Sequence, residues 1–202
     1  MPDNLKTYWG WQTWLKYKHL FSQTDYLLWS EPSPWVDEVE IILLANKKMV
    51  SALVEQHVND FRQALQKETV SSEGLLKEAK TKPLLREVLQ KHEGLIGTLL
   101  GYGRENSWLF HKRDLGESVS LGYPWDSTEE LKDVRHSLAW FGLVYRPSQD
   151  LSTELSCPHF VADIHSEETR QLKESYLSMR KKILKIYQDK NFLETTLNFL
   201  IN

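Results

Sequence analysis

The chain has 202 residues, of which 41% are hydrophobic and 26% charged, and its formal net charge is -3. This length can bury one sizeable core, so the sequence predicts a single domain over residues 1–202. The near-neutral charge argues against general affinity for nucleic acid or anionic lipid, and the lone Cys157 excludes an internal disulfide and a multi-cysteine zinc site.

Two features bear on the cellular location. No stretch of about 18 apolar residues occurs, which argues against a transmembrane helix. The first residues also lack the apolar segment that a secretory signal requires. The sequence therefore predicts a soluble chain, cytoplasmic as written, while export after removal of a signal or by another route stays an alternative.

Residues 1–35 form an aromatic-rich N-terminal segment, which includes Trp9, Trp11 and Trp14. Large aromatic side chains bury much apolar surface, so we expect this segment to pack on the body formed by residues 36–202. The alternative is that these tryptophans, together with nearby lysines, contact a protein partner or a membrane interface. Packing in the core is the preferred interpretation.

The next elements follow from local patterns. The prolines within residues 31–35 require an extended or turned chain. Residues 39–46 are predicted to form a short buried strand, although the start of a helix fits the same apolar run. Apolar residues recur every three or four positions over residues 47–67, which predicts one amphipathic helix. A short helix is expected within residues 71–80, and a third begins at Pro83 and runs to about Leu100.

The second half of the chain is predicted to be mostly helical. A capping box at residues 127–130 starts one helix, and residues 137–147 fit a strand or, equally, a buried helix. Ser166 is predicted to cap a long helix whose apolar stripe runs over residues 172–186. A second capping box, at residues 191–194, starts a terminal helix. The fold class is therefore mostly α (α+β), with a small strand element.

Residues 94–113, GLIGTLLGYGRENSWLFHKR, contain four of the nine glycines of the chain. A glycine inside a helix costs about 1 kcal/mol relative to alanine, so this density needs a structural reason. Gly94, Gly97 and Gly101 share one helix face, and almost every residue between them is apolar. The pattern predicts a buried, glycine-rich central helix over residues 84–100 that touches another backbone.

The turn after this helix is the candidate ligand site. Gly101 and Gly103 match neither a dinucleotide-binding fingerprint nor a Walker loop. A new helix is expected to follow them, and its free N–H groups can hold an anion, although a plain helix cap explains the same residues. The candidate ligand-binding residues are Gly101, Gly103, Arg104, Asn106, His111 and Arg113.

Metal and catalytic motifs are incomplete. The sequence HEGLIG begins like a zinc-protease helix, but Ile96 stands where the second histidine is required. His159, Asp163 and His165 share one face of an extended segment and could ligate a metal, although a connector that leads into a helix explains them better. No GxSxG motif occurs. Catalytic residues and cofactors therefore stay unknown, and no metal site is predicted.

The stretch HEGLIGTLLGYGRENSWLFHKR, together with FGLVYRP, CPHFVAD and SEETRQLKESY, resembles an uncharacterised family of host-associated Gram-negative bacteria, including chlamydia- and legionella-like organisms. The resemblance covers most of the chain after residue 38. It implies no activity and carries over no catalytic residue. It indicates GYGRENS and LFHKR as the segments where a site is expected first.

Two functional hypotheses follow. The first is a non-enzymatic binding or interaction protein with a protein partner, because aromatic residues are abundant and no catalytic set is complete. The alternative is a small-molecule binder or enzyme that holds an anionic ligand at the GYGREN turn. Nucleic acid is not an expected partner, and membrane contact through the N-terminal aromatic residues is the less favoured alternative.

Overall fold

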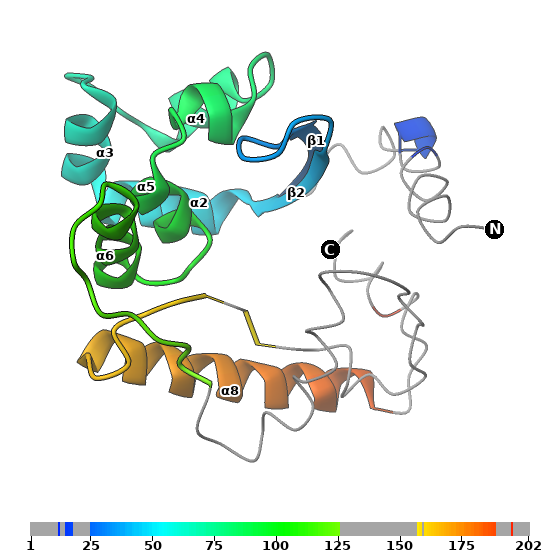
Figure 1. Ribbon diagram of the computed structural model, residues 1–202. Coiled ribbons are helices and arrows are strands. Elements are labelled where there is room, and N and C mark those ends of the chain that lie inside the picture. The colour runs from blue at the N-terminus through cyan, green and yellow to red at the C-terminus, as the bar shows by residue number, and fades with distance from the viewer. Residues whose placement is uncertain are drawn as a thin grey trace. The chain divides into compact units, whose positions relative to one another are not determined.

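The computed structural model describes residues 12, 15–17, 25–125, 157–158, 160–188 and 195. The contacts divide the chain into two compact units, of which one comprises Asp25–Pro124 and Phe160–Lys173. The described residues are mostly helical and contain a two-stranded antiparallel sheet, which confirms the predicted α+β class (Figure 1). The single domain and the boundary at residue 35 stay predictions, but the first strand lies before that boundary and belongs to the unit that starts at Asp25.

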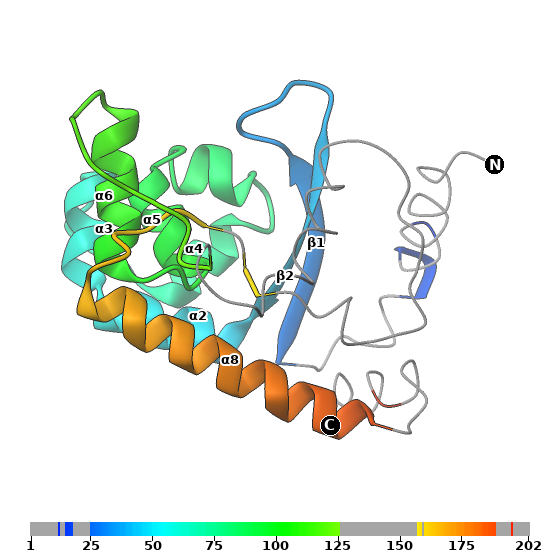
Figure 2. The ribbon, with the colours of Figure 1, turned by 60° about the horizontal axis from the view of Figure 1, so that its bottom comes forward.

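The sheet is a hairpin of β1 (Tyr26–Pro32) and β2 (Glu40–Asn46), drawn in blue in Figure 2. Side chains alternate between its two faces, so Trp29 and its cross-strand partner Leu43 pack against the helical core. The strand predicted at residues 39–46 is confirmed, but only one of its faces is buried. β1 was not predicted, because its strand conformation depends on pairing with β2.

Two helices follow β2 directly. α2 (Lys47–Gln56) is capped by the Asn46 side chain, and α3 (Val58–Leu65) begins after His57. His57 has φ -117° and ψ 26°, which interrupts the single helix predicted for residues 47–67. The apolar stripe nevertheless faces one core on both sides of this break, with Val54 in α2 and Phe61 in α3 buried.

The predicted short helix is α4 (Ser72–Glu78), and Ser71 accepts a hydrogen bond from Gly74 N at its start. The continuous helix predicted for residues 84–100 is wrong. A π-helical turn, η2 (Leu84–Val88), is followed by a separate helix, α5 (Glu93–Leu99). Gln90 and Lys91 between them have φ of 54° and 56°, which no continuous right-handed helix allows. α5 is buried, as expected for the glycine-rich central helix.

Two further helices complete this part of the structure. α6 (Arg104–Asp114) begins directly after Gly103, as predicted from the glycine turn. α8 (Glu167–Tyr187) begins after Ser166, whose hydroxyl accepts a hydrogen bond from Thr169 N at 3.1 Å. This contact confirms the predicted cap. Before α8, Ala162 pairs with Gly122 in an isolated antiparallel bridge.

Several predictions concern residues that the structure does not describe. They are the capping boxes at 127–130 and 191–194, the strand or helix at 137–147, and the tryptophans Trp9, Trp11 and Trp14. Among the residues that are described, no helix is both long and apolar enough to cross a membrane.

Candidate functional site

The glycines of α5 allow α6 to approach closely. A Cβ atom placed on Gly97 would lie 2.6 Å from Ser107 Oγ and 3.5 Å from Ser107 Cα. One placed on Gly94 would lie 3.3 Å from the Trp108 ring. The contacts at Gly97 leave no room for a side chain, and a side chain at Gly94 would require the Trp108 ring to shift, so the glycine face of α5 is a close helix contact, as the sequence predicts.

Gly101 and Gly103 form the turn between α5 and α6. Their φ angles are 83° and 88°, which glycine adopts without the strain that other residues suffer. A Cβ atom on Gly103 would also lie 2.5 Å from Glu168 Oε2 and 2.7 Å from Leu172 Cδ1. Gly103 is therefore required both by the turn and by the approach of a carboxylate from α8.

The carboxylate of Glu168 lies at the N-terminus of α6. It accepts hydrogen bonds from Glu105 N at 3.1 Å and from Asn106 N at 3.0 Å. These N–H groups have no partner inside the helix, and the helix dipole favours a negative charge beside them. The place predicted for an anionic ligand is thus filled by a side chain of the same protein. Glu168 itself lies in the first turn of α8.

Asn106 joins the same helix end to the segment before α8. Its side chain is 1% exposed. Asn106 Nδ2 donates to Thr169 Oγ1 at 2.9 Å, and Asn106 Oδ1 accepts from Asp163 N at 3.1 Å. A buried amide with these partners is satisfied, so Asn106 acts as a structural link between two segments.

The other predicted site residues lie in different places. Arg104 donates to both carboxylate oxygens of Asp60 on α3, at 2.5 and 2.8 Å. The His111 ring stacks on His92 with a centroid distance of 3.9 Å, and the Arg113 guanidinium lies 4.7 Å from the Phe110 ring centroid. His111 is two helical turns beyond Arg104, about 10 Å along the axis. The structure therefore brings Gly103, Arg104 and Asn106 together at the start of α6, but not His111 or Arg113.

The pair between Arg104 and Asp60 predicts a small acid-sensitive contribution to stability. The Arg104 guanidinium holds the pKa of the Asp60 carboxyl below its usual value of 3.8. A lowered pKa stabilises the folded protein fully above the unfolded value, and this contribution is lost as the pH falls below 3.8. Because the Arg104 side chain is 46% exposed, we expect Asp60→Asn to lower the free energy of unfolding by no more than about 1 kcal/mol at pH 7.

Urea titrations of wild type and Asp60→Asn at several pH values would check this expectation. The two proteins should differ at neutral pH and converge as the pH falls below 3.8. A difference that is the same at every pH would contradict the assignment of the effect to the ionised carboxylate.

His92, Trp108 and His111 form a half-buried aromatic cluster between α5 and α6. His92 Nδ1 accepts a hydrogen bond from Leu95 N at 3.3 Å and so caps α5. Burial, reinforced by the neighbouring His111, lowers the pKa of His92. A neutral His92 is the form that can accept this hydrogen bond, so the cluster serves the packing of the two helices.

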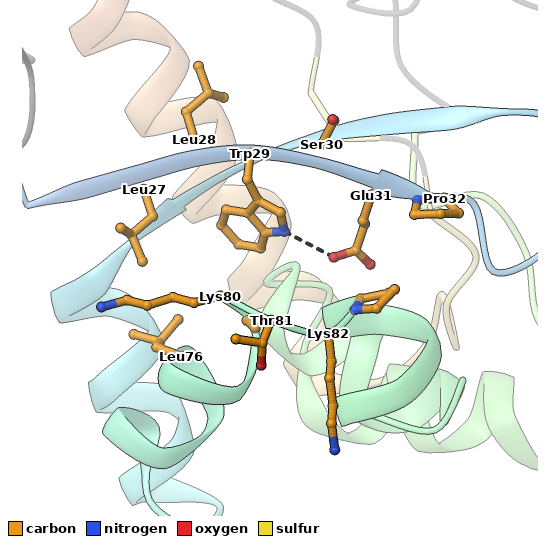
Figure 3. A pocket seen from close by; sticks show the side chains of 12 residues that line it. Leu27, Leu28, Trp29, Ser30, Glu31, Pro32, Leu76, Lys80, Thr81 and Lys82 are labelled. Carbon is orange, nitrogen blue, oxygen red and sulfur yellow. Dashed lines mark hydrogen bonds between the residues drawn. The ribbon is translucent and has the colours of Figure 1, made fainter. Parts of the chain in front are cut away.

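A pocket lies between β1 and the turn that follows α4 (Figure 3). Its volume is about 390 Å³, and its walls include Leu27, Trp29 and Leu76. Its polar lining residues include Lys80 and Thr81. This pocket could not be predicted from the sequence, because β1 carries no strand pattern of its own and the turn after α4 carries no motif.

Glu31 closes one end of the pocket and is 4% exposed. Its carboxylate accepts three hydrogen bonds, from Trp29 Nε1 at 3.0 Å, Leu84 N at 2.7 Å and Leu85 N at 2.8 Å. The last two are free N–H groups at the start of η2. Glu31 therefore fixes both the Trp29 ring and the first turn of η2.

The segment before α8 contains His159, Asp163 and His165, which the sequence presents as possible metal ligands. His159 is outside the described residues, and the Asp163 carboxylate accepts the backbone N–H of His165 at 3.0 Å. Within the described ranges, no group of three or more His, Cys, Asp or Glu side chains is placed to hold a metal ion. The geometry of the described segment is that of a connector into α8.

The described structure thus contains two places with distinct chemistry, the start of α6 with its own carboxylate and the pocket beneath β1. Inference about function has to come from this geometry, because the chain matches no protein-family model, no curated protein and no solved structure. The resemblance to a family of host-associated bacteria stays a prediction.

Proposed function

We propose that this chain is a non-catalytic interaction protein that docks a protein partner on the outward face of the β1–β2 hairpin. The observation that carries the proposal is the exposure of large aliphatic side chains there. Ile42 is 45% exposed and Leu44 is 60% exposed. Large connected apolar surfaces are uncommon on monomeric proteins and usually mark interaction sites.

The neighbouring residues extend this face. Leu44 lies directly opposite Leu28, and Ile42 opposite Ser30, so the outward side chains of the two strands form one surface. The loop that joins the strands adds exposed Val36, whereas Trp35, also exposed, donates its indole N–H to Glu93 of α5 at 2.6 Å. Directly opposed side chains on a hairpin are close enough for one partner to cover them together.

Charge at the end of the hairpin indicates the chemistry of the partner. Asp37, Glu38 and Glu40 are exposed beside this apolar surface. Carboxylates at the rim of an interface favour a partner with basic residues in matching positions, and they raise the association rate at low salt. We therefore propose a partner whose contact surface is apolar and is flanked by lysine or arginine.

The alternative function, an anion binder at the GYGREN turn, has weaker support. An incoming anion would have to displace the Glu168 carboxylate from the N–H groups of Glu105 and Asn106. It would also have to compete with Asp60 for Arg104. The energy of binding would be reduced by the loss of these internal contacts.

Polar substitutions on the outward face test the interaction. In the double variant Ile42→Thr/Leu44→Thr, threonine keeps the preference for strand but removes most of the apolar surface. We expect the variant to melt within about 2 °C of wild type, since exposed positions tolerate substitution, and to lose the partner that wild type captures from native lysate. Quantitative mass spectrometry after cross-linking measures the capture.

Leu115→Thr is the matched control, because Leu115 is a leucine 68% exposed at the end of α6. It should keep the partner. The purified partner should bind wild type more weakly as salt is raised, because salt screens the acidic residues at the rim. Equal capture by wild type and the double variant would overturn the proposal, as would a captured partner whose cross-linked surface lies away from the hairpin.

A further inference from the structure

We infer that the pocket beneath β1 binds an amphipathic monocarboxylate, a small organic anion whose apolar body lies against Trp29 and whose charge pairs with Lys80. This site lies on the inward face of the hairpin, opposite the surface proposed for the protein partner. The inference therefore goes beyond the proposed function and does not depend on it.

The apolar part of the pocket comes from separate segments. Leu27 and Trp29 project from β1 toward Leu76 of α4 and the turn after it (Figure 3). A volume of about 390 Å³ is in the range of pockets that bind small molecules. The hydrogen bond from Trp29 Nε1 to Glu31 holds the indole in place, so an aromatic or aliphatic ligand meets a wall that is already formed.

The positive charge comes from Lys80. Lys80 lines the pocket, and in Figure 3 its side chain runs beneath Leu27, at the end of the pocket away from Glu31. Glu78, the acidic residue nearest in sequence, is paired with Lys67 at 3.0 Å. None of the ion pairs found within the described part of the chain involves Lys80. Its ammonium group is therefore available for an anion.

Lys82 provides an internal comparison. It also lines the pocket, but Figure 3 shows its side chain directed away from the hairpin. The two lysines are two residues apart on one turn and both are exposed. Of the two, only Lys80 follows the hairpin, where its ammonium can meet the carboxylate of a ligand whose body extends from Trp29 past Leu27 (Figure 3). The two positions therefore separate a specific contact from a general effect of positive charge.

Glu31 limits the ligand to one negative charge. Its carboxylate lies at the end of the pocket opposite Lys80 (Figure 3), and all three of its donors are groups of the protein. A second carboxylate on the ligand would approach this buried negative charge without a compensating donor. The pocket therefore favours a monocarboxylate over a dicarboxylate of similar size.

The test uses the full chain labelled with ¹⁵N and two probes of similar shape, 2-naphthoate and the neutral 2-naphthamide. The Trp29 indole N–H resonance is assigned with Trp29→Phe. We expect 2-naphthoate to shift this resonance in a saturable way and 2-naphthamide to bind about three- to fivefold more weakly, the upper part of the range for the loss of one exposed ion pair. Naphthalene-2,6-dicarboxylate should also bind more weakly than 2-naphthoate.

Alanine substitutions then distinguish the role of Lys80 from that of Lys82. Lys80→Ala should weaken 2-naphthoate binding about three- to fivefold, while Lys82→Ala should stay within about twofold of wild type. Because both positions are exposed, both variants should keep the wild-type melting temperature. The inference is overturned if 2-naphthoate leaves the Trp29 resonance unmoved, if the amide binds equally well, or if both lysine variants behave alike.

Discussion

Replacing Gly97 by leucine should lower the free energy of unfolding by at least about 1 to 3 kcal/mol, the range typical of an overpacked core. Even the Cβ atom of the new side chain would lie 2.6 Å from Ser107 Oγ and 3.0 Å from Ser107 Cβ. Both residues are buried, so the side chain cannot turn toward solvent. Denaturation by urea, followed by far-ultraviolet circular dichroism, measures the change.

Three further substitutions make this result specific, two at the contact and one as a control. Gly97→Ala should also destabilise the protein, and Ser107→Gly should relieve part of that loss, because it removes the atoms that the new methyl group meets. Gly74→Ala is the control, since its Cβ would meet only the Ser71 hydroxyl, at 3.1 Å, in a helix of seven residues. A Gly97→Leu protein that melts within about 2 °C of wild type would contradict the close contact of α5 with α6.

The helix contact at Gly97 could be predicted because glycine is costly in a helix and its spacing places several on one face. The breaks between the helices could not be predicted. The apolar stripe continues from α2 through His57 into α3, since both helices face the same core. The break before α5 depends on the positive φ angles of Gln90 and Lys91, which are not typical of those residue types. The spacing of apolar residues indicates which face of a helix is buried, but it does not reveal a local change in the direction of the chain.

The candidate sites were harder to predict because they join distant segments. The start of α6 was predicted to attract an anion, and the physical basis of that prediction is sound. The anion is Glu168, 63 residues along the chain from the N–H of Glu105, and nothing local links the two. The pocket likewise joins β1 to a turn about 50 residues later. Neither Glu168 nor the turn after α4 lies in a sequence motif that would mark it as part of a site.

Glu31→Gln should lower the free energy of unfolding by about 2 to 3 kcal/mol, although the substitution changes the size of the side chain little. The side chain keeps its size but loses its charge and one of its two acceptor oxygens. Its partners are Trp29 Nε1, Leu84 N and Leu85 N, which all donate. The amide NH₂ of glutamine must therefore face at least one donor, and a buried N–H group is left without an acceptor.

Glu105→Gln is the matched control, because Glu105 is exposed on α6 and contributes only its backbone N–H to the contact with Glu168. Its free energy of unfolding should stay within about 0.5 kcal/mol of wild type. Hydrogen exchange adds a local measurement, since the Leu84 and Leu85 amides should lose protection in Glu31→Gln and keep it in Glu105→Gln. If the two variants are equally stable and equally protected, the carboxylate of Glu31 does not hold η2, and the wall of the pocket must be fixed by apolar packing of Trp29 alone.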